Sequence, residues 1–157
     1  MKGTYFLLLF VLFVGQAIGF TGTPDGYGQT KSLSDSPGMS AEGTKYMLGA
    51  EEIDGVKGVV YLNDVRKKMA EHGLKQTHHI MISFVDVNSG AAIESGSVAV
   101  KVEAPDEKVM DAISLLSMDG DFGADITLNK KGLYHFQLGT KLADGKKRIF
   151  HYHFENK

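Results

Sequence analysis

The alternation of apolar and polar residues predicts strands over most of the chain after residue 77. Five segments have this period-two pattern or the β-branched and aromatic composition of strands: 78–87, 97–102, 121–128, 133–142 and 147–154. Short stretches rich in Gly, Asn and Asp separate most of them, as expected of turns. Six to eight strands at this spacing predict a mainly β protein, an immunoglobulin-like antiparallel β-sandwich. A small β-barrel is the structural alternative.

The residues before this region predict a hairpin followed by one short N-terminal helix. Residues 45–53 and 56–62 read as strands around Asp54-Gly55, a dipeptide typical of two-residue hairpin turns. Asn63 is a suitable N-cap for the helix that follows, and Gly73 suits the left-handed residue after its end. This α/β extension precedes the sandwich in the same domain.

The last two predicted strands can be placed in register from their apolar residues. Alternate positions in both strands are apolar: Tyr134, Phe136, Leu138, Phe150, Tyr152 and Phe154. These positions fall on one face if Leu142 pairs with Lys146 across a three-residue loop. Gly145 then occupies the position where that loop type needs a left-handed residue.

This register predicts a cluster of histidines on the polar face of the hairpin. His135 lies opposite His153, and His151 is a diagonal neighbour. We expect 121–128 to be the adjacent hairpin strand, which places Asp125 on the same face. Three imidazoles and a carboxylate are suitable ligands for copper or zinc. The alternative is a solvent-exposed face whose histidines bind no metal.

A second histidine pair begins the strand at 78–87. Adjacent strand residues point to opposite faces, so only one of His78 and His79 can join a given cluster. His79 and Met81 share a face and form a nitrogen and sulfur pair that is attractive to copper. The alternative is that Met81 fills the core and the histidines mark the end of a strand.

The beginning of the chain has the layout of a secretory signal peptide. Lys2 is followed by an apolar run at 5–14 and by small residues before a cleavage point near Gly19-Phe20. The run is shorter than the roughly 20 residues of a membrane-spanning helix, so we expect no stable span in the mature chain. A retained N-terminal anchor is the alternative. Cleavage predicts a periplasmic or secreted protein.

The mature chain then divides into two predicted parts. Residues 20–44 are rich in Gly, Ser, Thr and Pro and poor in aliphatic residues, which predicts a flexible leader. Residues 45–157 form a single domain, with 45–74 as its α/β extension.

Composition excludes several classes of function. The chain has no cysteine, so it can carry no disulfide, thiolate metal site, iron–sulfur cluster or cysteine-linked haem or lipid. The formal charge of −2 becomes −3 when Lys2 leaves with the signal peptide, which argues against nucleic acid as a partner. The sequence contains no serine nucleophile elbow, no HExxH motif and no kinase-like motif set, and we expect the protein not to be an enzyme.

A set of residues, mostly at core and turn positions, lies between 78 and 154: Asp86, Gly90, Ile93, Gly96, Val98, Val100, Met118, Gly120, Phe122, Ala124, Gly132, Tyr134 and Phe136. With these residues, the chain from 78 to 154 resembles the YtkA-like/FixH-like group of exported immunoglobulin-like domains. The resemblance implies a location in the bacterial envelope and a role linked to copper or to cytochrome-oxidase assembly. It supplies no ligand set.

The sequence therefore predicts an exported, non-catalytic protein that binds or handles a metal, with copper preferred and zinc as the other choice. The predicted ligands are His135, His151 and His153, supplemented by His79, Met81 and Asp125. The alternative is an interaction or accessory module that binds an envelope protein and no metal.

Overall fold

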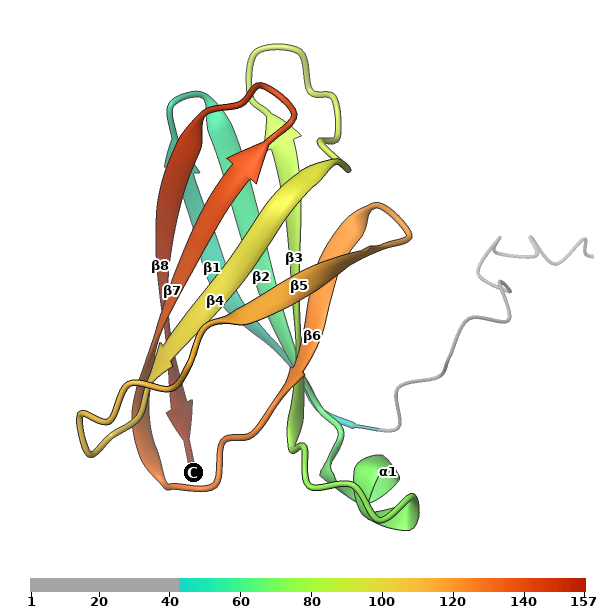
Figure 1. Cartoon of the computed structure of the whole chain (residues 1–157), viewed down its shortest axis with the longest axis vertical. Coiled ribbons are helices and arrows are strands. Elements are labelled where there is room, and N and C mark those ends of the chain that lie inside the picture. The colour runs from blue at the N-terminus through green and yellow to red at the C-terminus, as the bar shows by residue number, and fades with distance from the viewer. Residues whose placement is uncertain (1–42) are drawn as a thin grey trace, which may run out of the picture. The chain divides into compact units, whose positions relative to one another are not determined.

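The computed structural model describes residues 43–157, which form eight strands and one short helix (Figure 1). The elements are β1 (Lys45–Ile53), β2 (Val56–Asp64), α1 (Arg66–Glu71), β3 (His78–Asp86), β4 (Gly96–Glu103), β5 (Ile113–Met118), β6 (Asp121–Ile126), β7 (Gly132–Leu142) and β8 (Lys147–Asn156). The predicted signal peptide and nearly all of the predicted leader lie outside the described residues. Among the residues described, no helix is both long and apolar enough to cross a bilayer.

All strand pairs are antiparallel, and the strands follow the order β1-β2-β3-β6-β5-β4-β7-β8. The sheet turns a corner at β5, because Ile113–Leu115 pair with β4 whereas Leu116–Met118 pair with β6. This corner rolls the sheet until its two outer strands, β1 and β8, lie side by side (Figure 1). The prediction of a mainly β antiparallel domain is confirmed, and the rolled sheet is nearly a barrel.

The core fills the inside of the rolled sheet with alternate residues of seven strands and with Leu128, which follows β6. The buried apolar side chains are Val56, Val60, Leu62, Ile80, Ile82, Phe84, Val98, Val100, Val102, Leu115, Phe122, Ile126, Leu128, Tyr134, Phe136, Leu138, Leu142, Phe150 and Tyr152. The period-two pattern places their polar neighbours on the outer surface. Burial of this set is the main driving force for the fold.

Side chains, rather than a ladder of paired strands, hold β8 against β1 and β2. The Tyr152 hydroxyl donates to the Gly58 carbonyl oxygen at 2.9 Å, and Tyr46 packs on Phe154 with ring centroids 5.1 Å apart. Gly58 is needed here, because a Cβ at that position would lie 2.9 Å from the Tyr152 hydroxyl oxygen. Burial raises the pKa of Tyr152 to about 12, with a further contribution from nearby Glu51. We call this contact region the seam.

A buried arginine closes one end of the seam. The Arg148 side chain is only 1% exposed, and its guanidinium forms a two-pronged ion pair with Asp144, at 2.6 and 3.1 Å. It also donates to the carbonyl oxygens of Ile53 and Asp54, at 3.2 and 3.4 Å. Arg148 therefore connects the β7–β8 loop to the β1–β2 turn. Its hydrogen bonds to Asp144 lower the pKa of that carboxyl to about 2.

Both hairpins predicted from turn residues are confirmed. Ile53 pairs with Val56 around Asp54-Gly55, whose φ angles of 48° and 73° suit the expected turn. His135 pairs with His153 in the β7–β8 hairpin, and Gly145 has a φ of 73°. Local turn chemistry thus fixes the register of each hairpin.

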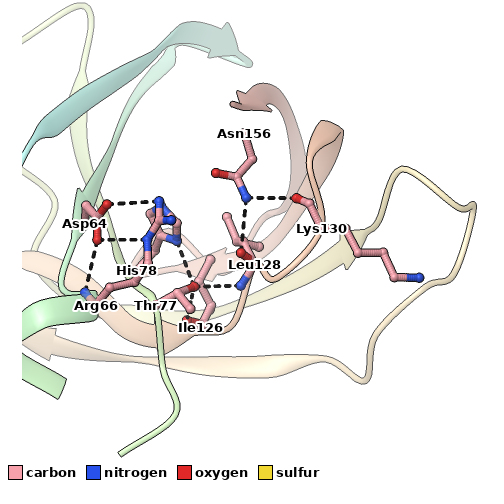
Figure 2. Close-up of polar contacts among 8 residues, drawn as sticks. All are labelled: Asp64, Arg66, Thr77, His78, Ile126, Leu128, Lys130 and Asn156. Atoms are coloured by element: carbon pink, nitrogen blue, oxygen red, sulfur yellow. Dashed lines mark hydrogen bonds and ion pairs between the residues drawn. The ribbon is translucent and has the colours of Figure 1, made fainter. Parts of the chain in front are cut away.

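The expected hairpin between 121–128 and β7 is wrong. β6 pairs with β3 and β5, whereas β7 pairs with β4 and β8. The connection crosses from one part of the rolled sheet to another, and side chains bind its backbone (Figure 2). The hydroxyl of Thr77 accepts from the Leu128 amide at 2.7 Å, and the Asn156 amide donates to the carbonyls of Leu128 and Lys130 at 3.1 and 2.8 Å. These bonds stabilise a crossover where sequence proximity favoured a turn.

The helix α1 (Arg66–Glu71) is shorter than the predicted helix, which was expected to fill the segment between the cap at Asn63 and Gly73. Asn63 lies in β2 opposite His79, so the prediction that it caps the helix is wrong. Val65 holds the cap position without a side-chain hydrogen bond, and α1 buries none of its residues. Gly73 has a φ of 70° just after the helix, as its position predicts.

His78 is a fully buried imidazole at the end of the core nearest the crossover. Its Nδ1 lies 2.8 Å from the Thr77 hydroxyl, whereas its Nε2 has no hydrogen-bond partner in the described chain (Figure 2). Burial lowers the pKa of His78 below its ordinary 6.5, and Arg66 adds to this effect while Asp64 opposes it. The neutral imidazole is therefore the form that the fold favours.

We expect His78 to make the fold less stable in mild acid. The unfolded chain binds a proton at His78 near pH 6.5, whereas the folded chain resists it, so the unfolding free energy declines as the pH falls below 6.5. The slope from one such group is at most about 1.4 kcal/mol per pH unit. Urea unfolding between pH 7.5 and 5 should show a smaller decline in His78→Gln than in the wild-type protein. Equal slopes would contradict this account.

Removal of one hydroxyl tests the seam. Tyr152→Phe keeps the buried ring but removes the donor to the Gly58 carbonyl, which should lower the unfolding free energy by about 1 kcal/mol. Tyr61→Phe is the control. It also removes one tyrosine hydroxyl, but from a ring that packs under Lys45 on the outer surface. Urea denaturation of the two variants gives the comparison, and equal stability would show that the hydroxyl contributes nothing.

Candidate functional site

The three predicted histidines share one exposed face of the β7–β8 hairpin. His135 and His153 are directly opposite, with ring centroids 4.7 Å apart and ring planes at 84°. His151 lies opposite Gln137, one position along the same face. All three side chains are exposed, so the face is open to a ligand.

A carboxylate that the sequence reasoning missed completes a row with two of these histidines. β4 is the other neighbour of β7, and its pairing places Glu103 directly opposite His135. Glu103, His135 and His153 therefore lie side by side across three adjacent strands. The alternation of β4 contained a signal for it, since Val98, Val100 and Val102 face the core and residue 103 must face outward. The missing information was that β4 lies beside β7.

The row borders a shallow hollow of about 340 Å³ on the outer surface. The residues around the hollow are Lys101, Glu103, Val109, His135, Phe136, Gln137, His151, Tyr152 and His153. Glu103 is half-buried, since the loop after β4 returns and places Val109 against it. The hollow therefore presents nitrogen and oxygen donors in a partly enclosed position.

The donors are near one another but are not arranged as a finished metal centre. Within residues 43–157, no three His, Asp or Glu side chains are positioned to hold one metal ion. Two imidazole nitrogens bound to the same tetrahedral zinc lie about 3.3 Å apart, given bonds of 2.0–2.1 Å. The two rings have centroids 4.7 Å apart and stand edge to face, so their side chains would have to rotate to direct both nitrogens at one ion.

The other predicted ligands lie on a different part of the surface. Because β6 pairs with β3, Asp125 lies opposite His79 and not beside His135, so its predicted place in the histidine cluster is wrong. The Asp125 Oδ1 is 2.7 Å from the His79 Nδ1. A carboxylate can only accept, so His79 is the donor of this bond.

His79 and Met81 share the outer face of β3, as their spacing predicts. Both are half-buried, and the Met81 sulfur lies 3.6 Å from the Asn63 side-chain amide nitrogen, so Met81 is not a core residue. His78 points the opposite way, into the core, and is not available to either group. The six predicted ligands thus separate into His135, His151 and His153 on one face and His79, Met81 and Asp125 on another.

Comparison with known proteins gives a fold likeness and no family. No protein-family model matches the chain, and no curated protein matches it. A solved structure of a DUF4426 family protein from Pseudomonas aeruginosa is similar, with a TM-score of 0.51 and 15% sequence identity. The match covers 68% of this chain and 92% of that protein. It supports the β-rich fold, and the resemblance to the YtkA-like/FixH-like group stays a prediction.

Proposed function

We propose that the protein binds a transition metal, copper or zinc, without catalysing a reaction. The observation that carries this proposal is the row of Glu103, His135 and His153 on three adjacent strands. His151 is the supplementary imidazole on the same face. Two imidazoles and a carboxylate are a donor set that Zn(II) and Cu(II) accept in proteins.

The surroundings of the row support reversible binding more than structural binding. The hollow is open on its outer side, so solvent or a partner can supply the remaining ligands. The side chains must rotate to converge, which costs conformational freedom and lowers the affinity relative to a rigid site. These features suit a protein that acquires and releases a metal.

The proposal extends to location and fold group. The signal-like segment at 1–19 and the resemblance over 78–154 both support export to the bacterial envelope. The two parts of the rolled sheet on either side of the β5 corner enclose the core, which supports assignment to the immunoglobulin-like sandwiches.

An accessory module that binds an envelope protein is the second candidate function. Beside the histidine row, the same outer surface carries a strip of small and apolar residues, with Ala99, Gly139 and Ile149 around a smaller hollow of about 140 Å³. Ile149 is 50% exposed and adds a large apolar side chain to this strip. A partner that docks on this strip would lie next to the proposed metal ligands.

Metal titration of matched variants tests the proposed function. We expect calorimetry with Zn(II) and Cu(II) to detect one bound metal in the wild-type protein, and His135→Ala/His153→Ala to weaken that binding by at least about tenfold. Glu103→Gln should weaken it as well, because the amide cannot supply the negative charge of the carboxylate. His151→Ala determines whether the third imidazole contributes.

His72→Ala is the control for this titration, since His72 is an exposed histidine just after α1 and lies in neither donor group. It should bind metal as the wild-type protein does. Wild-type affinity in the double histidine variant would remove the proposal and favour the accessory module.

A further inference from the structure

A separate group of donor atoms lies over Gly123 on the outer face of β3, β5 and β6. Gly123 pairs with Met81 on β3, and it has no side chain to cover the sheet between its neighbours. A Cβ at Gly123 would lie 2.8 Å from the His79 Nε2 and 3.1 Å from the Met118 methyl carbon. The His79 ring and the end of Met118 therefore occupy the space that a side chain at residue 123 would fill.

These distances place a nitrogen and a thioether next to each other. Because both atoms lie near the same point, the His79 Nε2 and the Met118 methyl carbon are within about 6 Å of each other. The Met118 sulfur is one bond from that methyl carbon. Met81 is two residues from His79 on the same strand face and pairs with Gly123, and its sulfur contacts the Asn63 amide nitrogen of β2 at 3.6 Å.

Asp125 orients the imidazole for a ligand. The His79 Nδ1 donates to the Asp125 carboxylate at 2.7 Å, so the neutral imidazole carries its proton on Nδ1 and has a lone pair on Nε2. The Nε2 atom lies over Gly123, together with the methyl carbon of Met118. A carboxylate behind a histidine is the usual partner of a metal-binding imidazole, because it sets the tautomer and increases the basicity of the ligand.

We infer that His79 Nε2 and Met118 Sδ form a binding site for Cu(I), with Met81 Sδ as the third donor once its side chain rotates away from Asn63. Thioethers are soft donors that select Cu(I), whereas Zn(II) and Cu(II) prefer the nitrogen and oxygen donors of the histidine row. The two sites would hold different oxidation states of copper on separate surfaces. This inference does not depend on the proposed function, because it uses none of the same residues.

Met118 and Met81 differ in how a metal would reach them. Met118 is 42% exposed, so a metal ion can reach its side chain from solvent. The Met81 sulfur accepts a hydrogen bond from the Asn63 amide at 3.6 Å, and the second lone pair of that sulfur remains for a metal. The end of Met118 thus lies beside an oriented imidazole, and rotation of the Met81 side chain would add the second sulfur.

Competition for Cu(I) under anaerobic, reducing conditions tests the site. The purified full chain is titrated against the chromogenic Cu(I) chelator bicinchoninate. We expect the wild-type protein to withdraw one Cu(I), and Met118→Leu and Met81→Leu each to bind it at least about tenfold more weakly. Leucine keeps the apolar volume and removes only the sulfur, and circular dichroism confirms that each variant is folded.

Two controls separate this site from other sources of binding. Met47→Leu should retain wild-type affinity, since Met47 is an exposed methionine on β1 and lies outside the site. His135→Ala/His153→Ala should also retain it. Wild-type affinity in Met118→Leu, or loss of Cu(I) only in the double histidine variant, would overturn the inference.

Silver(I), a redox-inert substitute for Cu(I), gives an independent measurement on the unmodified protein. In methionine-methyl NMR spectra, one equivalent of Ag(I) should shift the Met81 and Met118 signals and leave the Met47 signal in place. A spectrum in which neither Met81 nor Met118 responds would also overturn the site, whatever the stability of the variants.

Discussion

The structure depends on how β8 is held at the seam. Arg148 is almost completely buried, and such a cation is tolerated only when its charge and its donors are satisfied. Asp144 supplies the charge, and the carbonyls of the β1–β2 turn accept the remaining hydrogen bonds. With Tyr152 bound to Gly58, these contacts keep the aromatic face of β8 inside the sheet. Alternation then requires His151 and His153 to face outward, so the candidate site is a direct consequence of the seam.

The two donor groups show how one rolled sheet can offer two surfaces of different chemistry. The surface of β4, β7 and β8 presents imidazoles with a carboxylate, whereas the surface of β3, β5 and β6 presents an imidazole with thioethers. β5 belongs to both parts of the sheet, because its first three residues pair with β4 and its last three with β6. The same strand that rolls the sheet therefore separates the two surfaces.

Local signals in the sequence predicted what depends on local chemistry. Asp54-Gly55 and Gly145 identified two turns, and the turns fixed the opposition of His135 and His153. The alternation of side chains along a strand also placed His79 and Met81 together on an outer face. None of these predictions required knowledge of distant strands.

The predictions from sequence are wrong where strands that are far apart in the sequence pair with each other. Sequence proximity suggested that 121–128 pairs with β7, but side chains of Thr77 and Asn156 stabilise a crossover between them. Asp125 was therefore assigned to the wrong surface, and Glu103 was missed although its outward direction was readable. The neighbour of a strand is determined by packing of the whole core, which no short window of sequence contains.

The seam also has a consequence for the order of folding. Its hydrogen bonds join residues 94 to 100 positions apart: Arg148 to Ile53 and Asp54, Tyr152 to Gly58, and the His151 amide to Glu51. Contacts of such long sequence separation require the ends of a large loop to meet, so they form slowly and after the hairpins. The β1–β2 and β7–β8 hairpins can therefore exist before the sheet closes. Until closure, the aromatic residues of β8 are exposed to water and to other chains, and this interval is when aggregation competes with folding.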